Sequence, residues 1–307
     1  MKAILIGAVE STRIALECLV RAPGWDLSAV LTLPPSLDDR HSDFVDLSAH
    51  AQQAGARLLH VANMNSEEGL NIISELAPDY VFVIGWSQIC GPDFMARSNG
   101  RVVGYHPAAL PRLRGRGVIP WTILLDEPIT ASTLFRIDAG VDSGPILAQR
   151  FFHVAPGETA ASLYAKHMAA LEAIMPSMLE GLAHGTAEET VQDDRYATWA
   201  TRRRPEDGVL DWTAPAATVW RVIRACGDPY PGAWTWLAGD KVVIDAAELV
   251  PLSRYSAAIS GQVIERTPDS FTVKCGDEAG VRVTRWKRSK PGPPPMHCVL
   301  GRSGALI

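Results

Sequence analysis

The sequence predicts an α/β fold in which a Rossmann-like, doubly wound sheet is followed by a small C-terminal OB-like β-barrel domain. Short apolar runs alternate with helical patterns over roughly the first half of the chain, which is typical of βαβ units with right-handed crossovers. Residues 80–84 are apolar throughout, as expected for a parallel strand that is buried on both faces. After Pro229, several short strand patterns follow one another, which favours a small barrel.

The expected elements of the first domain follow from local patterns in chain order. We expect strands at 2–6, 27–33, 57–61, 80–84, 132–137 and 146–154. We expect a helix that Ser11 or Thr12 caps and that runs to Arg21, and further helices at 46–53, 66–76, 118–125 and 159–179. Pro176 should kink or shorten the last of these helices, and Gly181 should lie just past its end. The turn after the first strand has no GxGxxG motif, which argues against a nicotinamide cofactor.

The length and composition predict two domains with a connecting segment. The chain has 307 residues, of which 47% are hydrophobic, so it can bury a sizeable core. We expect a catalytic domain at 1–183, a polar linker at 184–207 and the OB-like domain at 208–307. Within the last domain we expect a helix at 214–226 and strands at 235–237, 241–244, 261–265, 270–274 and 280–284.

Charge and cysteine usage exclude several classes of protein. The net charge is −5, so the chain lacks the basic surplus of proteins that grip a nucleic-acid backbone. The five cysteines form no CxxC motif and have no histidine in metal-ligand register, which predicts a reducing, cytoplasmic location and no metal. No apolar run approaches the ~20 residues of a membrane span, so we expect no membrane partner.

The strongest candidate for chemistry is the stretch 102–150. His106 follows the apolar pair at 102–103, where a strand gives way to a loop, and Asp142 lies in the loop after the strand at 132–137. We expect the two strand ends to bring the imidazole and the carboxylate together, because a carboxylate beside a histidine fixes its tautomer and favours its charged form. Arg114 and Arg116 make the intervening loop attractive to anions. A single loop histidine is more often structural than catalytic, and the two arginines are equally compatible with solvated loop charges.

His106, its surrounding motif and Asp142 together favour a catalytic role over a purely structural one. The motif HPxxLPxxRG, which starts at His106 and is followed by the DxG of Asp142, resembles the formyltransferase family that uses 10-formyltetrahydrofolate. The resemblance implies catalytic roles for His106 and Asp142 without a metal. The family's third catalytic group is an asparagine two residues before the histidine, and this chain has Gly104 there. We expect Gly104→Asn to restore a donor and raise the transfer rate, provided that the pocket has room.

The same resemblance implies a folate-binding surface on two loops. It assigns cofactor contacts to the segment after the strand at 80–84, to one arginine and to the loop before Asp142: Trp86, Gln88, Ile89, Cys90, Arg116, Asp138, Ala139, Gly140 and Val141. Composition alone would instead place the tryptophan in the core.

The C-terminal region carries a second part of the resemblance. The runs DGVLDW at 207–212 and PYPGAW at 229–234 resemble the C-terminal domain of methionyl-tRNA and aminoarabinose formyltransferases. The implied function is formyl transfer to a primary amine of a nucleotide-linked amino sugar. The alternatives are formylation of methionyl-tRNA, hydrolysis of formyl-folate, and a folate-binding module with little or no activity, because Gly104 replaces the asparagine. The acidic composition makes tRNA the less favoured partner, and the oligomeric state, including a homodimer, stays open.

Overall fold

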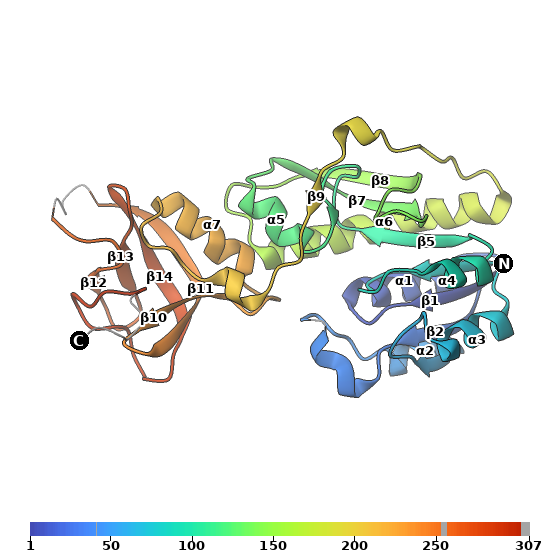
Figure 1. Cartoon of the computed structure of the whole chain (residues 1–307), viewed down its shortest axis with the longest axis horizontal. Helices are drawn as coiled ribbons and strands as arrows, with labels where there is room; N and C mark the ends of the chain where they lie inside the picture. Colours follow the sequence, from blue (N-terminus) through green and yellow to red (C-terminus); the bar gives the residue numbers. More distant parts are fainter. Residues whose placement is uncertain (41, 253–256, 302–307) are drawn as a thin grey trace. The chain divides into compact units, whose positions relative to one another are not determined.

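The computed structural model describes residues 1–40, 42–252 and 257–301. These residues form two compact units, each with its own sheet and hydrophobic core (Figure 1). The first unit contains Met1–Val118, Pro128–Val154 and Tyr164–Thr201. The second contains Ile119–Glu127, Ala155–Leu163 and the chain from Arg202 onward.

The sheet of the first unit is mixed. Its seven strands within the described residues are β1 (Lys2–Ile6), β2 (Asp26–Thr32), β3 (Arg57–His60), β4 (Tyr80–Val83), β5 (Val102–His106), β7 (Ile129–Arg136) and β8 (Ile146–His153). They lie in the order β3-β2-β1-β4-β5-β7-β8, and the first five are parallel. The last two strands are antiparallel to their neighbours, so the doubly wound part ends at β5.

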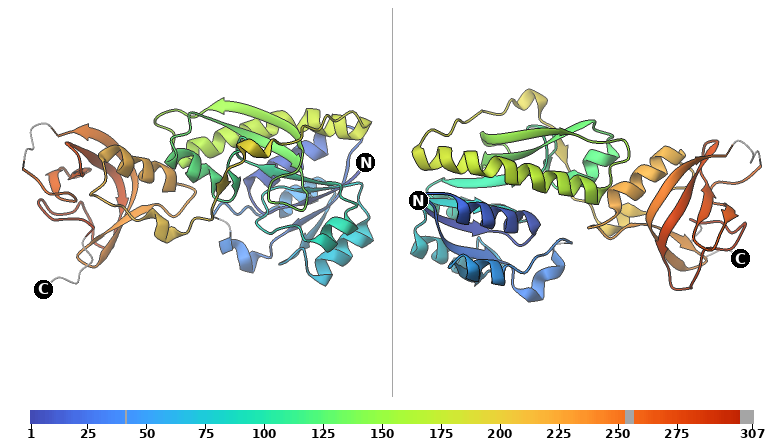
Figure 2. Two further views of the ribbon diagram at one scale, coloured as in Figure 1. Left: turned by 45° about the horizontal axis from the view of Figure 1, so that its top comes forward. Right: turned by 180° about the vertical axis from the view of Figure 1, so that it is seen from behind.

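Helices cover both faces of this sheet (Figures 1 and 2). The helices of the first unit are α1 (Glu10–Arg21), α2 (Ser48–Gln53), α3 (Glu67–Leu76), α4 (Pro92–Arg97) and most of α6 (Ala160–His184), whereas α5 (Val118–Leu124) belongs almost wholly to the second unit. One core packs α1 and α6 against Leu5, Phe82 and Val103. The other packs α3 and α4 against Ile6, Val83 and Val102. Because successive strand residues point to opposite faces, β5 directs Gly104 and His106 to the side of α3 and α4.

The first helix starts earlier than the sequence predicts. It begins at Glu10 with Val9 in the N-cap position, and not at a Ser11 or Thr12 cap. Thr12 Oγ1 instead accepts a hydrogen bond from the Val9 amide at 3.2 Å and donates one to the Ile84 carbonyl at 2.7 Å. Its hydroxyl therefore ties the helix to the end of β4, a contact that local sequence does not reveal.

The long helix α6 also differs from its prediction. It continues through Pro176 and Gly181 to His184, whereas the sequence predicts a kinked or shortened last turn near Leu179. Met175, Met178, Leu179 and Leu182 are all buried in the core on both sides of this proline. Their burial stabilises the last turns more than the lost proline hydrogen bond destabilises them.

Five antiparallel strands form the sheet in the described part of the second unit. They are β10 (Ala233–Leu237), β11 (Asp240–Pro251), β12 (Val263–Arg266), β13 (Phe271–Lys274) and β14 (Ala279–Lys287), in the order β10-β11-β14-β13-β12. The helix α7 (Ala216–Cys226) packs on this sheet through Val219 and Ile223. The Trp212 indole is buried beside them and donates to Thr235 Oγ1 at 3.0 Å. The predicted fold class, a Rossmann-like domain followed by a small domain of antiparallel strands, is confirmed.

The segment 184–207 contains ordered structure. Its strand β9 (Trp199–Ala200) pairs in parallel with β6 (Arg114–Gly115), next to the motif loop. Residues up to Thr201 group with the first unit, although the sequence predicts a linker here. None of the helices in the described ranges is both long enough and apolar enough to cross a membrane.

Candidate active site

His106 is the last residue of β5 and is almost fully buried. Its residue exposure is 5%, and Nε2 donates a hydrogen bond to the Leu113 carbonyl at 2.7 Å. Nδ1 faces the Asp142 carboxylate, with Oδ2 at 3.5 Å. Each ring nitrogen therefore faces an acceptor, so the orientation of the ring is fixed.

The carbonyl that holds His106 belongs to a constrained loop residue. Leu113 has a φ of +57°, in the left-handed region that residues other than glycine rarely adopt. Its amide donates to Thr198 Oγ1 at 2.9 Å, and the next amide, of Arg114, donates to the Thr198 carbonyl at 2.8 Å. The segment around Thr198 thus fixes the loop conformation that presents the Leu113 carbonyl to the imidazole.

Asp142 lies close to His106, as expected. The sequence suggested that two strand ends at the same edge of the sheet cause this proximity, and the structure shows a different cause. Because β7 is antiparallel to β5, the end of β7 lies level with Val103 while His106 pairs with Thr133. The loop after β7 therefore has to bring Asp142 back to His106. Its carboxylate accepts the Gly115 amide at 2.8 Å, and its own φ is +50°.

Two side chains hold the Asp142 loop in place. The sequence pattern did not indicate Gln192, and it suggested a different role for Arg114. Gln192 is 8% exposed, and its Nε2 donates to the carbonyls of Asp142 at 2.8 Å and Gly144 at 2.7 Å. Arg114 is 3% exposed, donates to Gln192 Oε1 and forms an ion pair with Asp194 at 2.8 Å. The expectation that Arg114 attracts anions is therefore wrong, since its guanidinium is occupied by these two side chains. No local pattern marks Gln192, because it lies in a polar segment.

This geometry lies within a chain that matches two known domain families. Residues 34–179 match the formyl transferase family, and residues 203–293 match the formyl transferase C-terminal domain. The chain belongs to the formyl transferase family. It is an enzyme of the formyltransferase class, as the motif around His106 predicts.

Solved structures share the fold over nearly the whole chain. The sugar 3N-formyl transferase WlaRD, crystallised with dTDP and 5-N-formyl-THF, has a TM-score of 0.68 at 17% identity and covers 92% of this chain and 97% of its own. An N-formyltransferase from Helicobacter canadensis, in complex with folinic acid and dTDP-3-aminofucose, has a TM-score of 0.66 at 16% identity, with 92% and 99% covered. HypX from Aquifex aeolicus, in complex with tetrahydrofolic acid, has a TM-score of 0.65 at 18% identity, with 94% of this chain and 44% of HypX covered.

Gly104, which stands at the family's asparagine position, has no space for a side chain. A Cβ atom at Gly104 would lie 2.9 Å from two carbons of the Phe135 ring and 3.0 Å from Cγ1 of Ile137. Phe135 is the residue that pairs with Gly104 across the strands, and it is buried. The room that Gly104→Asn requires is therefore filled by an aromatic ring.

The predicted folate loop at 86–90 is fixed by amide side chains. Gln88 donates to the Ala62 carbonyl at 2.7 Å and accepts the Met64 amide at 3.1 Å, so both ends of its amide are occupied. Asn65 donates to the Ile89 carbonyl at 2.8 Å in the same way. The Gln88 side chain thus has a structural role. It does not replace the asparagine that Gly104 substitutes in this chain.

The same loop lines a small, mostly apolar pocket. Its walls are formed by Ile6, Met64, Val83, Trp86, Gln88, Ile89, Cys90 and Phe94. The indole nitrogen of Trp86 is buried and has no hydrogen-bond partner among the described residues. Burial raises the pKa of the Cys90 thiol to about 12, so this sulfur is a neutral, apolar part of the wall.

The second predicted folate loop is exposed. Asp138, Ala139, Gly140 and Val141 all face solvent, as does Arg116. The Asp138 carboxylate accepts the Gly140 amide at 3.0 Å and the Ser143 hydroxyl at 2.8 Å, which shapes the turn that leads to Asp142. Within the described ranges, no group of three or more His, Cys, Asp or Glu side chains is placed to hold a metal ion.

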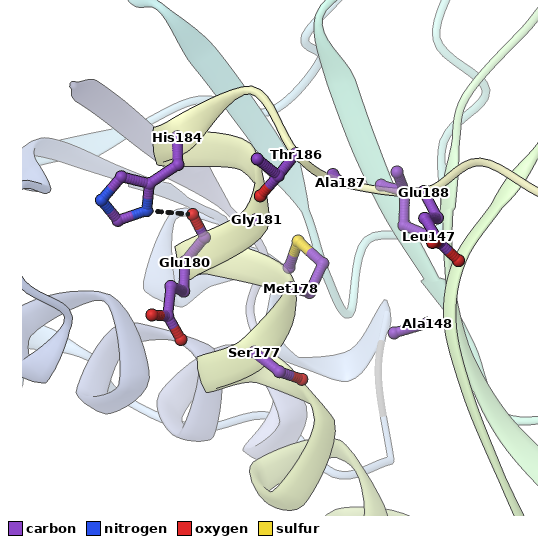
Figure 3. A pocket seen from close by; sticks show the side chains of 10 residues that line it. All are labelled: Leu147, Ala148, Ser177, Met178, Glu180, Gly181, His184, Thr186, Ala187 and Glu188. Carbon is purple, nitrogen blue, oxygen red and sulfur yellow. Dashed lines mark hydrogen bonds between the residues drawn. The ribbon is translucent and has the colours of Figure 1, made fainter.

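A second, open groove lies elsewhere on the first unit (Figure 3). It is lined by the end of α6, by part of β8 and by the loop 186–188, and it contains none of the predicted site residues. His184 donates from Nδ1 to the Glu180 carbonyl at 2.9 Å, along the helix itself. The groove therefore contributes nothing to the His106 site.

Proposed function

We propose that this formyltransferase moves a formyl group from 10-formyltetrahydrofolate to a primary amine, on a nucleotide-linked amino sugar. The His106–Asp142 pair, at 3.5 Å inside the matched formyl transferase domain, carries the proposal. The choice of acceptor is supported by WlaRD and the Helicobacter canadensis enzyme, whose structures contain dTDP or a dTDP-linked amino sugar and match this fold along its length.

The reaction requires one proton to leave and one to be supplied. The amine nitrogen attacks the formyl carbon, forming a new C–N bond and a tetrahedral intermediate. The amine loses a proton, which the His106–Asp142 pair accepts. The bond between the formyl carbon and the folate nitrogen then breaks, and that nitrogen takes up a proton, giving tetrahydrofolate and a formamide. A rigid ring with a carboxylate beside it is suited to this relay.

The oxyanion of the intermediate has to be stabilised without a side-chain amide. Gly104 supplies none, and the Gln88 amide is occupied by the backbone of Ala62 and Met64. Both ring nitrogens of His106 face acceptors within the protein, so the donors in this proposal are backbone N–H groups. Each well-placed donor of this kind is worth about 3–4 kcal/mol in other enzymes.

The pocket beside β4 has walls whose chemistry suits part of a folate, although it is closed in this structure and the loop 86–90 has to move for a ring to enter. The apolar side chains suit a flat heteroaromatic ring, and the buried Trp86 N–H, which has no partner in the described structure, offers one hydrogen bond to such a ring. We propose that Trp86, Gln88, Ile89 and Cys90 bind the cosubstrate here. We propose further contacts by Arg116 and the loop 138–141.

Pairing of basic residues favours a small acceptor over tRNA. Three basic residues of the second unit, Arg282, Lys287 and Arg288, each lie within 3.6 Å of a carboxylate. These charges are neutralised within the protein, which weakens them as phosphate ligands.

One observation favours a second candidate function. The Phe135 ring occupies the space of the family's asparagine side chain, as expected if the chain binds folate without transferring the formyl group. Folate binding with no transfer to any amine would show that the chain is a folate-binding module without transferase activity.

The deciding experiment offers the enzyme several acceptors. The chain is incubated with 10-formyltetrahydrofolate and, separately, with dTDP- and UDP-linked amino sugars and charged methionyl-tRNA. Release of tetrahydrofolate and the acceptor's mass gain are measured. We expect formylation of at least one nucleotide-linked amino sugar. Transfer only to tRNA would overturn the acceptor assignment, and release of formate without any acceptor would point to hydrolysis.

A further inference from the structure

Gln192 links three parts of the first unit: its own segment, the motif loop at Arg114 and the loop that contains Asp142 and Gly144. It lies on the segment between α6 and β9, which has no catalytic motif. Both ends of its amide are used. Nε2 donates to the carbonyls of Asp142 and Gly144, and Oε1 accepts two hydrogen bonds from Arg114, at 3.1 and 2.8 Å. Because donors and acceptor are all engaged, the orientation of the amide is fixed by its partners.

Arg114 anchors this amide in the protein interior. Its side chain is 4% exposed, and Nη2 also contacts Asp194, whose side chain is 81% exposed. Its backbone amide is held by Thr198 in the same segment. Gln192 is therefore held on one side by a buried guanidinium, and on the other side it holds the Asp142 loop.

The Asp142 loop needs such support. Asp142 has a φ of +50°, a conformation that costs about 1 kcal/mol or more for a residue with a side chain. Its carboxylate accepts a hydrogen bond from the Gly115 amide and faces His106 at 3.5 Å. A small rotation of this backbone would move the carboxylate away from the imidazole, and the Gln192 amide resists that rotation at the Asp142 carbonyl.

We propose that Gln192 is a positioning residue for formyl transfer, which acts through Asp142 on His106. The proposal rests on transfer at the His106–Asp142 site and does not depend on which amine accepts the formyl group. It assigns a function to a residue that contacts neither catalytic side chain. The carboxylate stays opposite Nδ1 because the Gln192 amide fixes the backbone that carries it.

The test uses Gln192→Glu. This variant keeps oxygen acceptors for Arg114 but replaces the N–H donors with an oxygen that faces two carbonyl oxygens. We expect kcat to fall about tenfold to a hundredfold, with KM for the formyl donor close to that of the wild type, since a displacement near 1 Å costs that much. The matched control is Asp194→Asn, which removes the negative charge of the other partner of Arg114 and should leave kcat unchanged.

A double-mutant cycle separates positioning from general stability. If Gln192 acts through Asp142, Gln192→Glu should lower kcat in the wild type but cause no further loss in an Asp142→Asn background, where asparagine also tolerates the positive φ. An equal fold-loss in both backgrounds would overturn the proposal. If Gln192→Glu does not fold, Gln192→Met, which keeps the length without the amide, takes its place in the cycle.

A second readout does not depend on activity. Ring ¹⁵N and ¹H signals of His106, assigned by their loss in His106→Gln, should shift in the same direction in Gln192→Glu and in Asp142→Asn. They should not shift further in the double variant. Unchanged His106 signals in folded Gln192→Glu would refute the positioning role, even if no amino sugar proves to be an acceptor.

Discussion

At the residue scale, His106 is defined by what its two ring nitrogens face. The Leu113 carbonyl lies at 2.7 Å from Nε2 and the Asp142 carboxylate at 3.5 Å from Nδ1, so the ring is held from both sides in a buried position. A ring held in this way loses little conformational freedom when the reaction begins, which is an advantage for proton transfer.

We predict that His106→Gln abolishes transfer while folate binding remains. In the proposed mechanism the imidazole moves protons, whereas the proposed folate contacts lie on other loops, so kcat should fall by about 100-fold or more. Turnover and calorimetric binding of a stable folate analogue are the measurements. The same substitution at the exposed His153 is the control and should change neither quantity. Wild-type turnover in His106→Gln would exclude this residue from catalysis.

Gly104 illustrates a substitution whose effect depends on its neighbours. With Phe135 carbons 2.9 Å from the Cβ position, Gly104→Asn should lower the stability by about 1–3 kcal/mol and should not raise kcat. In a Phe135→Ala background the same substitution should cost less, because the ring is gone. Thermal unfolding of the four proteins tests this coupling. A stable Gly104→Asn enzyme with increased kcat would mean that the ring moves aside easily.

At the element scale, the loop 86–90 is held by side-chain hydrogen bonds to the loop before α3. Gln88 and Asn65 each bridge the two loops, so the proposed folate pocket owes its shape to amide groups and not to the strand alone.

We predict that Gln88→Ala raises KM for the formyl donor several-fold and leaves kcat almost unchanged. The substitution loosens the loop that lines the pocket but leaves His106 and Asp142 in place. Steady-state kinetics with varied formyl donor measures both constants. The exposed neighbour Ser87 provides the control, since Ser87→Ala removes no hydrogen bond that shapes the pocket. A fall in kcat at constant KM would contradict this assignment.

At the scale of the whole molecule, the buried His167 makes stability depend on pH. Burial, together with the positive charge that His106 can carry, lowers the pKa of His167 to about 3 from an ordinary 6.5. Its Nδ1 lies 3.0 Å from Ser132 Oγ, while Nε2 has no partner among the described residues. The folded protein therefore resists a proton that the unfolded chain accepts.

We predict that this group destabilises the fold as the pH falls from about 6.5 towards 3. In that window the unfolded state binds more protons, so the free energy of unfolding drops by about 1.4 kcal/mol per pH unit from this residue. His167→Gln should show a shallower slope of stability against pH, even if it is less stable at neutral pH. Urea unfolding at several pH values measures the slope. His184→Gln, at an exposed position of the same helix, should keep the wild-type slope.

Much of the first unit could be predicted because its signals are local. The strands β1, β2, β3 and β4 lie within one residue of their predicted limits. In β1 and β4 the apolar run records burial on both faces of the sheet, whereas β3 is a short, partly exposed edge strand. The helix α4 was not predicted, because a six-residue helix carries little periodicity. The helix α6 continues past Pro176, although proline usually ends or kinks a helix, because apolar side chains after the proline are buried.

The α/β fold class, the formyltransferase resemblance and the choice of His106 and Asp142 as candidate site residues follow from the sequence alone, because they depend on runs and motifs within a few dozen residues. The surroundings of these two residues depend on the assembled fold. The antiparallel direction of β7, the ring of Phe135 over Gly104 and the burial of Arg114 against Gln192 all join residues far apart in the chain. Such contacts form only when the sheet is assembled, since side-chain packing and hydrogen bonding there depend on which strands become neighbours.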